Sequence, residues 1–275
     1  MGYNEKSSRK LGWKPEWFGC NDFGPKLKQA ISLFQAEYGL EADGFCGPST
    51  FRRKFNERAE ELEESDRDNI YSDYIICHGN AVPIEWDKVV LWTDRGGHEA
   101  KEGNYKKVDG QRDIDLFVTH WDVCLSSSIC QKVLDKRGIS VHFLIDNDGT
   151  IYQTLDTTHI AWHAGSVNSR SVGVEIANAY YPKWQSWYER KGFGKRDILK
   201  DSYVNGKKLE DHLGFYSVQL EALKALAKAI NRGLGIPLEA PEGFNGTQYT
   251  DTLNKHKLKA FKGFYIAIKL LFKCV

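Results

Sequence analysis

Residues 161–178, AWHAGSVNSRSVGVEIAN, place a histidine and a glutamate among small side chains. His163 lies in a segment rich in glycine, serine and asparagine, which favours a tight loop. The VGVEIA that follows is typical of a short buried strand, yet Glu175 stands in its middle. A carboxylate between Val174 and Ile176 must be paired, neutralised or used in chemistry. Glu175 and His163 are therefore candidates for a functional site.

His120 is a third candidate, because it closes the apolar run DLFVTHWD at residues 115–122. A strand fixes the backbone of its last residues, so a histidine there is well placed to hold a metal ion. The structural alternatives are a half-buried His120, an exposed His163 and a Glu175 paired only for stability. The chain has no His-Glu-x-x-His or Gly-x-Ser-x-Gly motif, and its glycines match no phosphate-binding loop. The residues alone thus indicate a His/Glu site without naming its reaction.

The N-terminal part of the chain is expected to be helical. Apolar residues recur at helical spacing over residues 25–38, with Pro25 suited to the first turn and Gly39 to the stop. A second helix, capped by Ser49 or Thr50, is expected to bury Phe51 and Phe55. The charged run over residues 56–68 has few core residues and indicates a domain boundary.

The rest of the chain mixes strands with helices. Residues 115–122 and 171–177 predict strands, and residues 140–155 predict a hairpin that turns at Asp148–Gly149. Residues 217–234 predict a helix ended by Gly235 and Pro237, with one apolar face. The residues of that face are Leu220, Leu223, Ala227, Ile230 and Leu234. We therefore expect an α/β (α+β) domain with a mixed central sheet flanked by helices, preceded by a small helical domain.

Composition excludes several classes of function. The 275 residues carry a formal net charge of +1, with bases scattered among acids, so no nucleic-acid partner is expected. The first residues contain no apolar signal segment, and the apolar tail is too short to span a bilayer. The six cysteines include no Cys-x-x-Cys pair, so they are expected to be mostly buried free thiols.

Two segments resemble known families. AISLFQAEYGLEADGFCGPSTFRRKF resembles the peptidoglycan-binding module of cell-wall hydrolases, with its FQ, GL and DG-x-x-G-x-x-T pattern. The matching residues are Phe34, Gln35, Gly39, Leu40, Asp43, Gly44, Gly47 and Thr50. FVTHWD, SVHFLIDNDGTIYQ, AWHAGSVNSRSVGVEIAN and the helix from residue 217 together resemble the type-2 N-acetylmuramoyl-L-alanine amidases. That family includes phage endolysins and the peptidoglycan recognition proteins.

The second resemblance implies roles for the candidate residues. It implies one Zn2+ held by two histidines and a cysteine or aspartate, with an open position for water. His120 matches the first zinc ligand, and Glu175 matches the general base of many bacterial members. His163 matches a histidine that lines the substrate groove, which Trp162 and Asn168 are expected to shape.

The family's second ligand histidine and its Asp-Pro-Gly or Cys-Pro-Gly segment have no direct counterpart, since the chain ends in FKGFYIAIKLLFKCV. His256 and Cys274 are the residues whose type and order suit the remaining zinc ligands. Lys273 is the candidate for the lysine that stabilises the oxyanion. The alternative is that this terminal segment is altered and leaves the metal site incomplete.

The resemblance therefore implies an endolysin-type, zinc-dependent amidase that cleaves the bond between N-acetylmuramic acid and L-alanine. The alternative is a catalytically incomplete peptidoglycan-binding protein of the same fold. The expected division is a wall-binding module at residues 1–58, a charged linker at 59–70 and a catalytic domain at 71–275. Peptidoglycan is the expected partner of a monomer that inserts into no membrane. It is expected to be made in a host cytoplasm and to act on the wall, in phage lysis, after release.

Overall fold

The computed structural model describes residues 2–59, 72–204, 206–241, 253 and 255–266. Most of the expected linker at residues 59–70 lies outside the described residues. The α-helices are α1 (Tyr3–Leu11), α2 (Pro25–Glu37), α3 (Pro48–Ala59), α4 (Ser127–Arg137), α5 (Gln185–Arg190), α6 (Ser217–Leu234) and α7 (Lys255–Ala260). Short 3-10 turns are η1 (Pro15–Phe18), η2 (Gly165–Arg170) and η3 (Pro182–Trp184). None of the described helices combines the length and the apolar character needed to cross a membrane.

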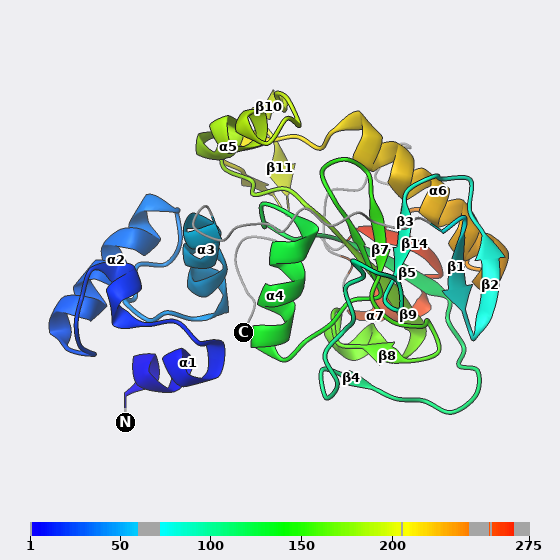
Figure 1. Cartoon of the computed structure of the whole chain (residues 1–275), viewed down its shortest axis with the longest axis horizontal. Helices are drawn as coiled ribbons and strands as arrows, with labels where there is room; N and C mark the ends of the chain where they lie inside the picture. Colours follow the sequence, from blue (N-terminus) through cyan, green and yellow to red (C-terminus); the bar gives the residue numbers. More distant parts are fainter. Residues whose placement is uncertain (1, 60–71, 205, 242–252, 254, 267–275) are drawn as a thin grey trace.

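A six-stranded mixed sheet forms the centre of the larger part of the molecule (Figure 1). Its order is β14 (Gly263–Ile266), β5 (Leu116–Trp121), β9 (Ser171–Ile176), β6 (Phe143–Ile145), β7 (Ile151–Gln153) and β3 (Val89–Leu91). The β6–β7 pair is antiparallel, as the turn at Asp148–Gly149 predicts, and the other neighbours are parallel. The fold class expected from the sequence is confirmed.

Smaller strand pairs lie outside this sheet. They are β1 (Tyr74–Cys77) with β2 (Asn80–Pro83), β4 (Tyr105–Lys106) with β8 (Ile160–Ala161), β10 (Ile198–Leu199) with β13 (His212–Leu213), and β11 (Tyr203–Val204) with β12 (Lys207–Lys208). All four pairs are antiparallel.

The two faces of the sheet bury different side chains. Val172, Val174 and Ile176 of β9 join a core that α6 and the β1–β2 pair cover. Because side chains alternate along a strand, Ser171, Gly173 and Glu175 lie on the opposite face, which is covered in part by α4. The glutamate thus occupies the non-core position of a regular period-two pattern.

Helix α6 has the predicted bounds, and its predicted face is confirmed in part. Its buried residues are Gln219, Ala222, Ala225, Leu226, Ala229 and Ile230. Of the expected face, Ile230 is in the core, and Leu223 and Leu234 pack against it. Leu220 is 42% exposed, so the prediction is wrong for this residue. Small alanines let the helix approach the sheet closely, so the buried face is centred on them and not on the leucines.

The N-terminal helices are held together by a buried glutamine. Gln35 Nε2 on α2 donates to Asp43 Oδ1, Phe45 O and Thr50 Oγ1, while Gly44 N donates to Gln35 Oε1. This network explains why FQ, DG and Thr occur together in the motif. Helix α3 begins at Pro48, so Ser49 and Thr50 lie in its first turn and the expected cap at these residues is wrong. Pro48 suits that position because it lacks an N–H.

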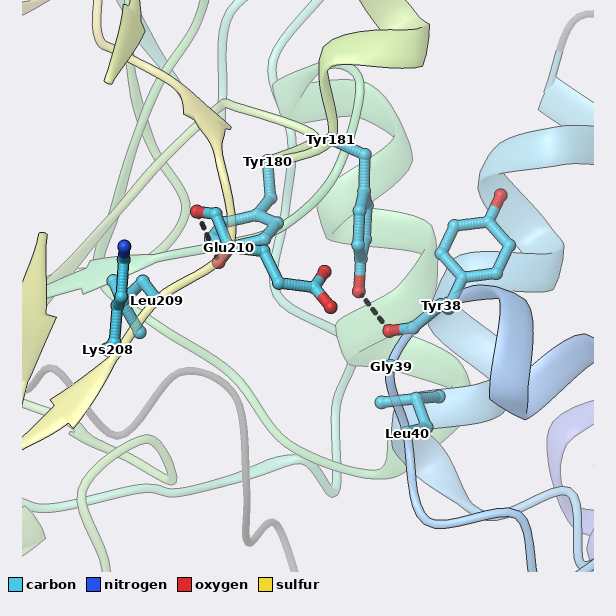
Figure 2. A pocket seen from close by; sticks show the side chains of 8 residues that line it. All are labelled: Tyr38, Gly39, Leu40, Tyr180, Tyr181, Lys208, Leu209 and Glu210. Carbon is cyan, nitrogen blue, oxygen red and sulfur yellow. Dashed lines mark hydrogen bonds between the residues drawn. The ribbon is translucent and has the colours of Figure 1, made fainter. Parts of the chain in front are cut away.

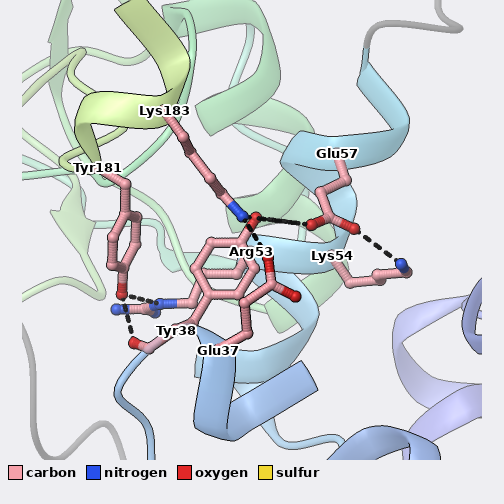
Figure 3. Close-up of polar contacts among 7 residues, drawn as sticks. All are labelled: Glu37, Tyr38, Arg53, Lys54, Glu57, Tyr181 and Lys183. Atoms are coloured by element: carbon pink, nitrogen blue, oxygen red, sulfur yellow. Dashed lines mark hydrogen bonds and ion pairs between the residues drawn. The ribbon is translucent and has the colours of Figure 1, made fainter. Parts of the chain in front are cut away.

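The helical part is fastened to the sheet domain through buried contacts, and their residues share one hydrophobic cluster. Arg53 Nε on α3 donates to Tyr181 Oη at 3.1 Å, and the Tyr181 hydroxyl donates to Tyr38 O at 2.7 Å (Figure 3). Lys183 Nζ lies 3.0 Å from Glu37 Oε1 at the exposed side of the same contact. We call this contact, centred on Tyr38, Arg53 and Tyr181, the seam.

Replacing Tyr181 with phenylalanine should destabilise the whole chain. The change leaves the buried Arg53 Nε and Tyr38 O without their shared hydroxyl, at a cost of about 1–3 kcal/mol in the free energy of unfolding. Urea denaturation would measure it. Tyr203→Phe is the matched control, because Tyr203 is 54% exposed. Equal unfolding free energies for the two variants would show that the seam adds no stability.

Candidate functional site

Two parallel strands bring His120 and Glu175 together. His120 of β5 and Glu175 of β9 are direct register partners, so their side chains leave the same face of the sheet side by side. Leu144 of β6 continues the same row on the other side of Glu175. The structure therefore joins two of the candidates, which lie 55 positions apart in the sequence.

His163 completes this group from the loop before η2. Its Nδ1 lies 3.0 Å from His120 Nε2, and its Nε2 lies 3.2 Å from Ser171 Oγ. The ring rests on the backbone of β9 at Gly173, where any side chain would meet it. We call the region bounded by His120, His163 and Glu175 the hollow.

The loop that carries His163 is shaped by Asn168. Its Oδ1 accepts the backbone N–H groups of His163 at 3.2 Å and Ala164 at 2.7 Å. Asn168 therefore acts on the hollow by holding the loop. Trp162, next to His163, is 38% exposed, so an aromatic face is available beside the hollow.

Burial keeps both histidines of the hollow neutral. Loss of hydration lowers the pKa of His120, the carboxylate of Glu175 opposes that shift, and the guanidinium of Arg52 adds to it. Burial also lowers the pKa of His163 well below its usual value, with further lowering by His120, His142 and Arg112. Neutral imidazoles keep a lone pair for a metal ion, so both rings are suited to coordination.

The geometry of this pair fits a metal ion. Two nitrogens at about 2.0–2.1 Å from a tetrahedral zinc lie roughly 3.3 Å apart, close to the 3.0 Å between His120 Nε2 and His163 Nδ1. The contact of His163 Nε2 with Ser171 Oγ is the kind of outer contact that orients a ligating imidazole. Glu175 Oε2 is buried and has no hydrogen-bond partner in the described structure, which leaves it available to a water or substrate.

A second group of potential metal donors lies nearby. Over the described ranges, Asp122, Cys124 and Cys130 are the set of three donors whose ligand atoms lie within 4.8 Å of one another. Burial raises the pKa of Asp122 and of Cys130 well above their usual values, which favours their protonated forms. A bound metal ion would itself favour the deprotonated forms, so this group and the two histidines are both candidate metal sites.

The side chains of three expected site residues lie outside the part of the chain that the structure describes. Lys273 and Cys274 lie outside the described residues, and of His256 only the backbone, in α7, is described. The five remaining cysteines are free thiols, as the sequence analysis predicts.

The sequence analysis did not single out Ser171, Gly173 or Arg52. Ser171 and Gly173 could have been found from strand alternation, because both share the face of Glu175. Arg52 is on the N-terminal helix α3, and no sequence pattern places it near His120.

Replacing Gly173 with alanine should disturb the hollow while leaving the strand intact. The new Cβ would lie 2.6 Å from His163 Cε1, so the ring must move. We expect a loss of about 1–3 kcal/mol in the free energy of unfolding, as for other overpacked sites, and a displaced His163 ring. Thermal unfolding and a crystal structure of the variant would measure both. Gly214→Ala is the control, since its nearest neighbour would be 3.5 Å away, and equal behaviour of the two would contradict the close fit.

A separate cavity lies at the seam and not at the hollow (Figure 2). It has a volume of about 180 Å³ and lies between the N-terminal helices and the β11–β12 pair. Its lining residues are Tyr38, Gly39, Leu40, Tyr180, Tyr181, Lys208, Leu209 and Glu210. None of the residues of the hollow is among them.

Comparison with known families decides the assignment. The model described as "N-acetylmuramoyl-L-alanine amidase" matches residues 110–257, more than half of the chain, including His120, His163 and Glu175. The chain belongs to the N-acetylmuramoyl-L-alanine amidase family. The model described as "Putative peptidoglycan binding domain" matches residues 17–53 of this amidase-family chain, and the resemblances to both families are confirmed.

Solved structures that are similar to part of this chain come from bacteria and animals. The N-acetylmuramyl-L-alanine amidase AmiD from E. coli is 21% identical, with a TM-score of 0.33, over 50% of this chain and 55% of its own. The endolysin LysCS from Clostridium intestinale is 19% identical, with a TM-score of 0.34, over 54% and 76% of the two chains. Drosophila peptidoglycan recognition protein SA is 20% identical, with a TM-score of 0.32, over 54% and 74%.

One curated protein shares a short segment with this amidase-family chain. The zinc D-Ala-D-Ala carboxypeptidase of Streptomyces albus G is 55% identical over 31 residues, which is 11% of this chain and 12% of that protein. The chain therefore spans only a small part of this relative and about half the length of AmiD.

Proposed function

We propose that the protein is an endolysin-type peptidoglycan hydrolase, a zinc-dependent amidase that cuts the amide between N-acetylmuramic acid and L-alanine. The observation that carries this proposal is that His120 and Glu175 lie side by side on one sheet face, with His163 against His120, in a chain of this family. An imidazole pair beside a carboxylate with a spare oxygen suits metal-assisted hydrolysis.

The residues of the hollow would have different roles in the reaction. His120 and His163 would hold the zinc, and one of the predicted ligands His256 and Cys274, whose side chains lie outside the described part, would be the third donor and leave a position for water. When bound, zinc supplies a more acidic water and polarises the carbonyl that is attacked. Glu175 would take a proton from the attacking water through Oε2 and then donate it to the departing amine of L-alanine. Lys273 remains a predicted stabiliser of the oxyanion.

The remainder of the chain would recognise the wall. Trp162 and the loop held by Asn168 would line the substrate groove, and the N-terminal module would bind peptidoglycan. We propose a monomer that acts at the cell wall in phage lysis, because both matched families concern peptidoglycan. Synthesis in a host cytoplasm, with action after release, is part of the same proposal.

A product assay tests the reaction. Incubating the protein with purified cell walls should release new amino groups belonging to L-alanine, identified by labelling and hydrolysis of the product. New reducing sugars without new amino termini would instead identify a glycosidase and overturn the proposal.

A binding protein without catalysis is the second candidate. It is favoured by the absence, among the described residues, of a third donor within 4.8 Å of both histidines. Metal analysis separates the two functions. About one tightly held zinc per chain supports the enzyme, and a metal-free chain that still binds walls supports the binding protein.

A further inference from the structure

Val123, just beyond the end of β5, has a backbone conformation that its residue type disfavours. Its φ is 54°, in the left-handed region, where β-branched residues are outliers and glycine is the usual residue. The side chain is fully buried, in a cluster that includes residues of the N-terminal helices and of α4. A strained residue persists only where the surrounding structure enforces its conformation, and such residues gather at functional sites.

The turn at Val123 is tied to both strands of the hollow. Asp122 N donates to Ile176 O at 3.2 Å, which continues the β5–β9 ladder beyond its last register pair. Asp122 Oδ1 accepts the N–H groups of Cys124 at 2.8 Å and of Asn178 at 3.1 Å. A change in the backbone of Val123 would therefore be passed to the ends of β5 and β9.

Asn56, on α3 of the N-terminal helical part, holds this turn from outside the sheet domain. Its Nδ2 donates to Val123 O at 2.7 Å, and the residue is 1% exposed. Helix α3 also packs on α4 (Figure 1). Asn56 Oδ1 is buried without a hydrogen-bond partner in the described structure, so this amide is a costly group to bury. Stability alone therefore explains an asparagine here poorly.

The seam fixes α3 independently of this contact. Arg53, three positions before Asn56, donates through Nε to Tyr181 Oη at 3.1 Å (Figure 3). That hydrogen bond joins α3 to the sheet domain without involving Val123. The two contacts can therefore be removed one at a time, which separates the docking of the helix from its effect on the turn.

We propose that Asn56 is a positioning residue, which acts on His120 by holding Val123 in its left-handed conformation. His120 lies three positions before Val123, so the turn sets where β5 ends and where the imidazole stands beside Glu175. The helical module would then shape the site as well as attach the protein to the wall. The catalytic part of this inference rests on the proposed function, whereas the placement of the His120 ring can be measured without any reaction.

Asn56→Leu tests the inference, because it keeps the approximate size of the side chain and removes the donor to Val123 O. In the full-length chain, we expect the ring 1H–15N NMR signals of His120 to shift and those of His98 to stay in place. With a soluble muropeptide, we expect kcat to fall about ten- to a hundredfold and KM to change by less than about twofold, since a misplaced group mainly slows the reaction. Asn56→Ala supplies the same comparison if the leucine variant does not fold.

Two further variants separate positioning from stability. Tyr181→Phe is the matched control, because it also removes a buried hydrogen bond between α3 and the sheet domain. It should leave the His120 signals and kcat at native values. Val123→Gly is the rescue, since glycine adopts the left-handed conformation without help. In this background, adding Asn56→Leu should lower kcat by less than about twofold, as expected when two changes act through one contact.

Unchanged His120 signals in Asn56→Leu, or the same change in Tyr181→Phe, would overturn the inference. A loss of kcat that is equally large in the Val123→Gly background would do so as well. Should the His120 signals move as expected in chains that release no L-alanine amino groups, the positioning role stands and the proposed hydrolase falls.

Discussion

Glu175→Gln should lower the rate of amide cleavage by about 10²–10⁴-fold while leaving attachment to the wall unchanged. The amide keeps the size and most of the shape of the side chain but cannot accept a proton from water. Glu175 Oε2 has no hydrogen-bond partner in the described structure, so the change breaks no hydrogen bond of that oxygen. Release of L-alanine amino groups from purified walls measures the rate, and a pull-down with the same walls measures attachment.

A surface glutamate provides the control for this variant. Glu221 on α6 is exposed and pairs with Lys224, so Glu221→Gln should cleave at the native rate. Native activity in Glu175→Gln would remove the carboxylate from the mechanism. Loss of wall binding together with activity would mean that the residue has a structural role.

His120→Ala should remove bound zinc and abolish amide cleavage. The variant loses one of the two nitrogens that lie 3.0 Å apart, and a single remaining imidazole holds a metal ion poorly. Metal analysis of the protein after dialysis should fall from about one zinc per chain to a trace. Because this readout is independent of catalysis, it tests the metal site directly.

The control is a histidine of the same domain outside the hollow. His98 stacks on the Tyr152 ring, so His98→Ala should keep its zinc. The paired variant Cys124→Ser with Cys130→Ser should also keep it. If that pair loses zinc and His120→Ala retains it, the metal lies at Asp122, Cys124 and Cys130 instead.

The alternation of side chains along β9 is a feature that the sequence pattern predicts correctly. The pattern of residues 171–176 places Val172, Val174 and Ile176 in the core and Glu175 on the other face, and the structure has this arrangement. The same local rules correctly predict α2, the β6–β7 hairpin and the bounds of α6. They fail for Leu220 of α6, which is exposed, because the buried face of a helix depends on the surface that it meets.

The sequence by itself determined the local elements, the fold class, the family and His120, His163 and Glu175 as candidates, since each depends on neighbouring residues or on a recognisable motif. Only the tertiary structure decided that His120 and Glu175 are register partners, that His163 rests on Gly173, and that Asn56 of α3 contacts Val123, three positions after His120. Strand pairing and helix docking join residues far apart in the chain, and their energy comes from complementary surfaces that no short window of sequence contains.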